Sequence, residues 1–283
     1  MMDVTAARAD GGSVALGDDD DLRPGHLLSL RCVGKVFGAG EKRYHALHNI
    51  DLDVPPGEFL CLLGPSGCGK STLLNIIAGF VPVSSGSIKF ANREITGPGP
   101  SRMMLFQDSL LALFPWLSVQ GNVEFGLRLR SSPAAERRQA ADQYLAMVGL
   151  AAHSHKFPHE MSGGMRQRLQ IARALATRPD VLLMDEPFGA LDALTRRHMH
   201  RVLLDVWEKT NTTVIFVTHD IAESLLLADR IAIMSIGPRS RVRELVDLRH
   251  LPRPRDPAAA DFGVAYRKIE HLLNEDPKIS DLP

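Results

Sequence analysis

Residues 59–71 read Phe59-Leu60-Cys61-Leu62-Leu63-Gly64-Pro65-Ser66-Gly67-Cys68-Gly69-Lys70-Ser71, and the order of apolar residues and glycines in them is informative about the fold. Five apolar residues in a row predict a central strand that is buried on both faces. The glycine-rich run after them fits the pattern G-x-x-x-x-G-K-[S/T]. In that pattern, backbone N–H groups and the N-terminus of the next helix cradle phosphate groups. The stretch therefore predicts a strand, a phosphate-binding loop and a helix in direct succession.

Single residues of this loop have separate expected tasks. Lys70 is expected to reach the β- and γ-phosphates of a nucleotide, and Ser71 to place its hydroxyl on Mg²⁺. The next helix, Thr72 to Ala78, is closed by Gly79 and directs its dipole at the anion. We expect nucleotide binding by Gly64, Pro65, Ser66, Gly67, Cys68, Gly69, Lys70, Ser71 and Thr72.

Two further apolar runs also end in polar residues. Val181-Leu182-Leu183-Met184 is followed by Asp185 and Glu186, and Val214-Ile215-Phe216-Val217 lies two residues before His219. Ligands bind at the carboxyl ends of strands in open α/β sheets. Short apolar runs alternate with helical stretches from Leu27 onward, which predicts an α/β fold with a largely parallel sheet.

The two carboxylates after the second run suit different tasks. Asp185 is suited to holding Mg²⁺ through water. Glu186 is placed to orient or deprotonate a water that attacks the γ-phosphate. The alternative is a solvated acidic pair at the end of a strand.

A second anion site is indicated by Met161-Ser162-Gly163-Gly164, which precedes a helical run to Ala176. By itself this is an ordinary N-cap with flexible glycines. As a functional site, the glycines allow close backbone approach while the cap and helix N-terminus offer donors to a phosphate. One domain rarely needs two such helix ends for one nucleotide, which favours a second copy of the chain.

These motifs together resemble the ATP-binding cassette (ABC) family of transporter ATPases, from about Leu28 to Met234. The resemblance implies a P-loop NTPase fold with a mixed, largely parallel sheet and an inserted α-helical subdomain. It implies ATP and Mg²⁺ as cofactors and ATP hydrolysis coupled to transport. It also implies a dimer, either a homodimer or a pair with another ABC subunit, in which Ser162-Gly163-Gly164 caps the γ-phosphate bound at the other subunit's phosphate loop.

The resemblance assigns further residues. Gln107 is similar to the glutamine that contacts Mg²⁺ and the attacking water, so Ser71, Gln107 and Asp185 are the implied metal ligands. Asp192 closes a loop similar to the one that couples the two ATP sites across the dimer. His219 is similar to the histidine that contacts the γ-phosphate. Without the other motifs, His219 would be read as a satisfied polar residue at a strand end. Phe37 resembles the aromatic residue that stacks on adenine, and Tyr44 is a nearby competitor.

The chain is expected to divide into three parts. Residues 1–26 are rich in Gly, Asp and Ala and predict a disordered tail. Residues 27–236 form the predicted ATPase domain, with a helical subdomain at about 108–178 in which a helix begins at Ser132-Pro133 and ends at Gly149. Residues 237–283 form a C-terminal extension with one amphipathic helix, Phe262 to Leu273.

Composition limits the partners and the location. The 33 Lys and Arg balance the 33 Asp and Glu, so we expect no nucleic-acid partner. Three cysteines and an acidic N-terminus without a signal pattern favour the cytoplasm. The most apolar stretch, Leu110 to Leu117, is too short to cross a bilayer. We expect a peripheral protein on the cytoplasmic face of the inner membrane, with separate transmembrane permease subunits.

The segment from Phe106 to Trp116 resembles the nitrate, sulfonate, taurine and bicarbonate importers, with about two extra residues between Gln107 and Pro115. Met165 replaces the commoner glutamine of the signature. The resemblance implies import of a small oxyanion such as nitrate, a sulfonate or taurine, together with an extracytoplasmic solute-binding protein. The alternatives are an ABC ATPase acting in DNA repair or on ribosomes, and a phosphate-loop kinase or GTPase.

Weaker signals concern reactive and charged side chains. Cys68 beside a helix N-terminus is expected to be a reactive thiolate, with an inert buried thiol as the alternative. Surface positions are favoured over metal binding for His153, His155, His159, His198 and His200. A solvated tail is favoured over contact with anionic lipid for Arg239, Arg241, Arg243, Arg253 and Arg255.

Overall fold

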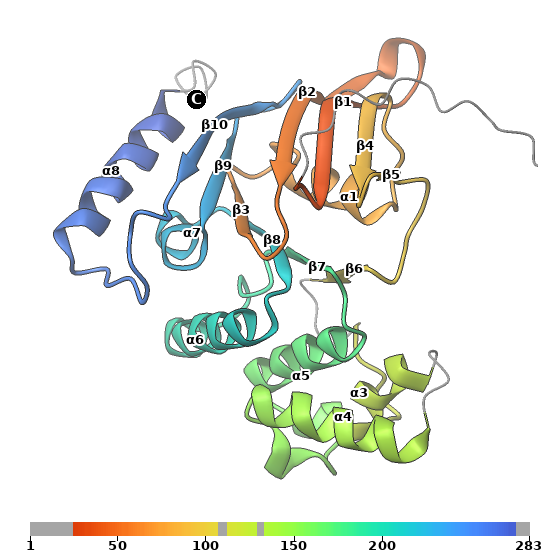
Figure 1. The fold of residues 1–283 in the computed structure, drawn as a ribbon. Helices are drawn as coiled ribbons and strands as arrows, with labels where there is room; N and C mark the ends of the chain where they lie inside the picture. The colour runs from red at the N-terminus through yellow and green to blue at the C-terminus, as the bar shows by residue number, and fades with distance from the viewer. Residues whose placement is uncertain (1–24, 107–111, 129–132, 276–283) are drawn as a thin grey trace, which may run out of the picture.

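The computed structural model describes residues 25–106, 112–128 and 133–275 (Figure 1). The strands are β1 (Leu28–Phe37), β2 (Tyr44–Val54), β3 (Phe59–Leu63), β4 (Ser85–Phe90), β5 (Arg93–Glu94), β6 (Arg102–Leu105), β7 (Val181–Asp185), β8 (Thr213–Thr218), β9 (Arg230–Met234) and β10 (Val242–Asp247). The helices are α1 (Lys70–Ala78), α3 (Val119–Arg128), α4 (Ala134–Met147), α5 (Gly163–Ala176), α6 (Ala193–Thr210), α7 (Ile221–Leu227) and α8 (Ala260–Asn274). Short 3₁₀ turns lie at Gly40–Lys42, Ala151–His153 and Pro158–Glu160.

The main sheet has six strands in the order β10-β9-β3-β8-β7-β6. The five strands from β9 to β6 are parallel, and β10 pairs antiparallel at one edge. The three strands predicted from continuous apolar runs are therefore neighbours, with β8 between β3 and β7. The predicted α/β fold with a mixed, largely parallel sheet is confirmed.

Alternate residues of these strands fill two separate cores. Phe59, Cys61 and Leu63 of β3 join the core with α5, α6, α7 and α8, whereas Leu60 and Leu62 join the core with α1. Strands β7 and β8 alternate in the same way. Fully burying one such leucine side chain stabilises the fold by about 2 kcal/mol. An unbroken apolar run is what a sheet covered on both faces requires.

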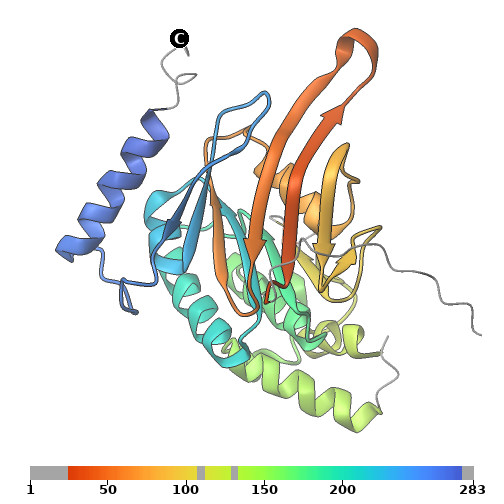
Figure 2. The ribbon, with the colours of Figure 1, turned by 45° about the horizontal axis from the view of Figure 1, so that its top comes forward.

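The second core is closed by a four-stranded antiparallel sheet, β2-β1-β4-β5. Its strands lie at the upper right of Figure 1, and Figure 2 shows the same sheet from above. Leu28 and Leu30 of β1 and Ile50 of β2 pack into the core around α1. The two sheets thus hold α1, and the loop before it, between them.

Helices α3, α4 and α5 lie between β6 and β7 in the chain and form the lower part of Figure 1. Helix α4 agrees with the predicted helix, because Pro133 is its N-cap and Gly149 follows its end with φ of 69°. Asn122 is fully buried, and its side-chain amide donates to the carbonyls of Phe114, Leu117 and Ser118. One side chain thereby fixes the segment that leads into α3.

The C-terminal region folds back onto the main sheet and α7. The predicted helix of this region is observed as α8, with Phe262 and Ile269 buried. Arg253 pairs with Asp229 at 3.1 Å and is only 16% exposed. Arg255 donates to the carbonyls of Leu225, Ala228 and Leu248, and burial followed by the charge of Arg253 lowers its pKa to about 10. The expectation of solvated side chains is wrong for these two arginines, because backbone carbonyls take the place of water.

Within the described ranges, helices are either too short or too polar to cross a membrane.

Candidate functional site

The phosphate loop lies between the end of β3 and the start of α1, as the sequence predicts. Gly69 is the N-cap of α1 and has φ of 90°, a left-handed conformation that suits glycine. Lys70 is buried, and its Nζ donates to the carbonyl oxygens of Gly64 at 2.6 Å and Pro65 at 2.9 Å. The ammonium group is therefore held inside the curve of the loop, where nucleotide phosphates would be received.

The environment of the Cys68 thiol differs from the accessible one that the sequence predicts. Its side chain is buried, and that burial raises the pKa of its thiol despite the opposing influence of Lys70. A Cβ on Gly64 would lie 2.9 Å from the Cys68 Sγ, so the thiol fills the space beneath the loop. The predicted reactive thiolate is wrong, because desolvation outweighs the favourable charge nearby.

Ser71 and Asp185 meet across the sheet edge. The Ser71 Oγ donates to Asp185 Oδ1 at 3.0 Å. Burial raises the pKa of Asp185, the hydrogen bond from Ser71 opposes that rise, and Glu186 adds to it. A hydroxyl and a carboxylate oxygen facing each other are a donor set that fits Mg²⁺. Gln107, the third expected ligand, lies outside the described residues, as does the segment of extra length that follows it.

Glu186 and His219 form a second polar pair beside the first. His219 Nδ1 lies 3.2 Å from Glu186 Oε1, and the side chains are 58% and 26% exposed, respectively. Glu186 has φ of 43°, an unfavourable backbone conformation for a glutamate. Its N–H donates to the carbonyl of Val217, which holds it in place. The carboxylate is thus fixed next to His219 and open to an incoming ligand.

Ser162 and Asp192 cap two helices that start close together. Ser162 accepts a hydrogen bond from the N–H of Met165, and Asp192 accepts from Leu194 and Thr195. The backbone and side-chain hydrogen bonds from Thr195, and then the backbone hydrogen bond from Leu194, lower the pKa of Asp192. A Cβ on Gly164 would lie 2.6 Å from Thr195 Cγ2, so glycine permits this close packing.

The structure does not bring Ser162-Gly163-Gly164 to the phosphate loop of the same chain. Helix α5 lies in the lower part of Figure 1, whereas α1 lies beside the antiparallel sheet in the upper part. Figure 2 shows the same separation. The two helices whose N-termini are the candidate anion sites, α1 and α5, are therefore apart in one described chain.

Phe37 and Tyr44 face each other across β1 and β2. The two residues are 41% and 47% exposed, and Lys35 Nζ lies 5.0 Å from the centroid of the Phe37 ring. A Cβ on Gly237 would lie 3.2 Å from the Tyr44 hydroxyl and 3.4 Å from the carbonyl oxygen of Gly67 in the phosphate loop. Both rings are accessible, so both remain candidates for stacking on a base.

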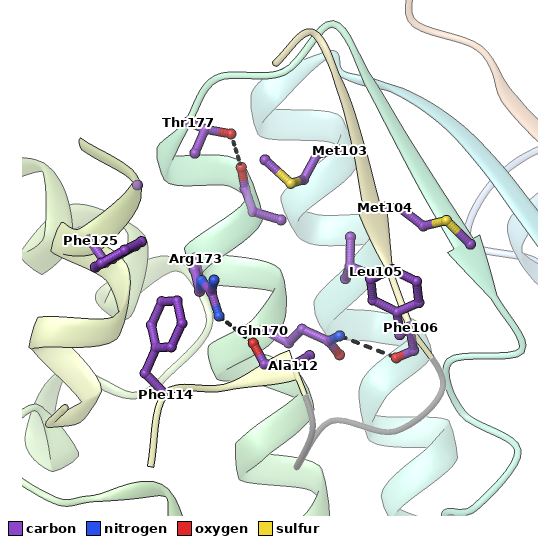
Figure 3. Close-up of a pocket in the computed structure, with 12 residues that line it drawn as sticks. Met103, Met104, Leu105, Phe106, Ala112, Phe114, Phe125, Gln170, Arg173 and Thr177 are labelled. Atoms are coloured by element: carbon purple, nitrogen blue, oxygen red, sulfur yellow. Dashed lines mark hydrogen bonds between the residues drawn. The ribbon is translucent and has the colours of Figure 1, made fainter. Parts of the chain in front are cut away.

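A mostly apolar groove of about 410 Å³ lies between β6, α3 and α5 (Figure 3). Gln170 donates to the carbonyl of Phe106 at 3.2 Å, and Arg173 donates to that of Ala112. The Arg173 guanidinium stacks 4.2 Å from the Phe114 ring centroid. Gln170 and Arg173 were not predicted from the sequence, although they are three residues apart on the helix that Ser162 caps.

The histidine predictions have mixed outcomes. His198 is exposed as expected, whereas His200 is buried and contacts Glu223, so its assignment to the surface is wrong. Within the described residues, no group of three His, Cys, Asp or Glu side chains is able to hold a metal ion.

A family model described as ABC transporter matches residues 47–189. The chain belongs to the ABC transporter family. Among curated relatives of this ABC ATPase, the nitrate import ATP-binding protein NrtD of Synechococcus elongatus is 42% identical over 249 residues, covering 87% of this chain and 90% of that protein. The bicarbonate transport ATP-binding protein CmpD of Synechocystis is 45% identical over 238 residues, covering 83% of each chain.

Solved structures of ABC ATPases support the same family assignment. A dimeric, post-hydrolysis state of the ATP-binding cassette MJ0796 with ADP and Pi has a TM-score of 0.66 at 32% identity, covering 78% of this chain and 98% of that one. The cbiO1 protein of Clostridium perfringens, part of the ABC transporter complex cbiONQ, has a TM-score of 0.74 at 28% identity, covering 90% and 97%. This ABC ATPase is an ATP-hydrolysing transporter subunit, and the kinase and GTPase alternatives are excluded.

Proposed function

We propose that this ABC ATPase energises the import of a small anion, such as nitrate, bicarbonate, a sulfonate or taurine. The proposal is carried by the 42% identity to a nitrate import ATP-binding protein across 90% of that protein's length. The similarity to a bicarbonate transport subunit supports the same class of cargo. The candidate site is suited to a nucleotide, so relatives rather than site geometry support the choice of anion.

We propose the following division of tasks during hydrolysis. Lys70 binds the phosphates, and Ser71 and Asp185, with Gln107, hold Mg²⁺. When bound, the metal neutralises charge on the phosphate oxygens. Glu186 orients and deprotonates the attacking water, and His219 contacts the γ-phosphate beside it. The 3.2 Å separation of Glu186 and His219 supports this pairing.

Two copies of the chain are needed for each ATP pocket in this proposal. One copy offers Lys70 and the other offers Ser162-Gly163-Gly164, with Asp192 in the loop between the two sites. The separation of α5 from α1 within one chain supports this arrangement. The dimeric cassette with 32% identity supports it independently.

The permease docks, in this proposal, at the groove of Figure 3. Phe106 at the end of β6 is 49% exposed and Trp116 is 71% exposed, so aromatic surface is available beside the groove. Large exposed aromatic side chains favour a protein partner. The complex would lie at the cytoplasmic face of the membrane and receive cargo from an extracytoplasmic solute-binding protein.

Uptake measurements test the cargo. Cells lacking this chain would receive either the native protein or Glu186→Gln, and uptake of labelled nitrate, bicarbonate, a sulfonate and taurine would be compared. We expect uptake of one anion class to be restored by the native protein and by the exposed control Glu244→Gln, but not by Glu186→Gln. Unchanged uptake of all four anions in cells lacking the chain would contradict the proposed cargo.

A further inference from the structure

The turn that carries His219 is closed by its own flanking side chains. Thr218, the last residue of β8, accepts a hydrogen bond from the N–H of Asp220 at 3.0 Å, across His219. Asp220 accepts from the N–H of Glu223 at 3.0 Å and caps α7. The Thr218 hydroxyl donates to Glu223 Oε2 at 2.5 Å. The backbone on both sides of His219 is therefore tied to Glu223.

The second carboxylate oxygen of Glu223 is bound from a different element. His200 of α6 places Nε2 2.8 Å from Glu223 Oε1. Both side chains are buried, with 9% exposure for His200 and 8% for Glu223. A buried carboxylate needs partners for its oxygens, because an unpaired one carries a large desolvation penalty. His200 and Thr218 together satisfy both oxygens of Glu223.

His200 also contacts the loop that carries the candidate water-activating carboxylate. Its ring lies 5.6 Å from the ring of Phe188, measured between centroids, and Phe188 is two residues after Glu186. Phe188 is buried and packs on Phe216 of β8. The imidazole therefore packs on the Glu186 loop through Phe188, and it is linked to the His219 turn through Glu223, which it contacts directly.

The surroundings favour one form of His200. Its Nδ1 is buried and has no hydrogen-bond partner in the described part of the chain. Hydrogen on Nε2 suits this environment, because the Nε2–H group donates to Glu223 and Nδ1 faces no acceptor among the described residues. The nearby Cys61 of β3 stays a neutral thiol, since burial and then the Glu223 charge raise its pKa.

We propose that His200 and Glu223 are positioning residues for ATP hydrolysis, which fix the His219 turn against the loop of Glu186. This inference rests on the roles proposed above for Glu186 and His219. Neither positioning residue touches the nucleotide. Their action is to keep the two reacting-site side chains at their 3.2 Å separation. Small displacements of such groups lower rates strongly.

A matched pair of substitutions separates the hydrogen bond from the packing. His200→Gln keeps a side-chain N–H donor near the position of Nε2, whereas His200→Leu keeps apolar bulk against Phe188 and removes the donor. We expect His200→Leu to lower kcat for ATP roughly tenfold with little change in KM, and His200→Gln to retain most of the activity. His250→Leu, at an exposed histidine, is the control.

Two further measurements distinguish positioning from simple support of the fold. Thermal unfolding shows whether each variant is folded at the assay temperature. Single-turnover hydrolysis in a His219→Ala background is the decisive comparison, because His200→Leu should add no further loss once His219 is gone. An equal loss in both backgrounds, or equal activities of the Leu and Gln variants, would overturn the inference. Full activity of His219→Ala alone would instead overturn the proposed role of His219.

Discussion

Cys68 shows how a single side chain can lie in a charged loop and still be shielded from water. The thiol lies beneath the phosphate loop with 1% exposure, and burial has a larger effect on its pKa than the nearby Lys70. A helix N-terminus and a lysine favour a thiolate only where the sulfur is also accessible to water. In the proposed nucleotide site, Cys68 would therefore act through its backbone and its volume rather than through its thiol.

Labelling of the three cysteines tests this conclusion. Cys32 is exposed, whereas Cys61 and Cys68 are buried, so iodoacetamide at pH 8 should modify Cys32 first. A raised pKa leaves less thiolate at that pH, and we expect Cys68 to react at least about tenfold more slowly than Cys32. Its rate should keep increasing above pH 9, as the thiol ionises. Mass spectrometry of digests gives the rates, and comparable labelling in the native state would contradict the prediction.

At the scale of elements, Arg253 and Arg255, which follow β10, donate hydrogen bonds to the carbonyls at the C-terminus of α7. The last carbonyls of a helix have no partner within the helix. Arg255 Nη1 donates to the carbonyls of Leu225 and Ala228 at 2.7 and 2.6 Å, and Arg253 donates to that of Leu227 at 2.5 Å. Positive charge at a helix C-terminus is also favourable for the helix dipole. The C-terminal segment therefore stabilises the helix that follows His219.

Arg255→Ala should lower the free energy of unfolding by about 3 kcal/mol. The reason is that three partly buried carbonyls lose their charged donor, those of Leu225, Ala228 and Leu248. Arg249→Ala is the control, since Arg249 pairs with Asp247 on the exposed surface, and its loss should change stability by less than about 1 kcal/mol. Urea unfolding followed by circular dichroism measures both. Equal changes for the two variants would contradict the assigned role of Arg255.

These elements also show which parts of the molecule the sequence could predict. Strands β3, β7 and β8 were predictable because each is covered on both faces and so reads as an unbroken apolar run. The antiparallel sheet was not predicted, because β1 and β2 mix buried and exposed residues, as in the pattern of Leu28–Phe37. Burial of His200 depends on Glu223, 23 residues away, and no local pattern indicates such a contact.

At the scale of the whole molecule, the proposed ATP pocket requires two copies of the chain, because the two candidate anion-binding helices, α1 and α5, are apart within one copy. Glu186→Gln removes the proposed base while keeping the shape of the side chain, so ATP should bind and remain uncleaved. We expect kcat to decrease at least about 100-fold. With Mg-ATP, the 31.1 kDa chain should then sediment as a dimer, and with ADP as a monomer.

Mixing two defective variants tests whether the pocket is shared. In the Glu186→Gln background, Lys70→Ala removes the phosphate-binding amine, and Ser162→Glu places a carboxylate against the phosphate. Either variant by itself damages both pockets of a dimer, so neither should dimerise with ATP. In a mixed dimer, the intact Lys70 of one chain meets the intact Ser162 of the other. One pocket is then complete, and ATP-dependent dimers with a single bound nucleotide should appear on mixing.

A different outcome would contradict the shared pocket. If the Glu186→Gln chain dimerises with ATP but the mixture of the two variants forms no dimer, each ATP is held within one chain, and the two helix ends do not share a phosphate.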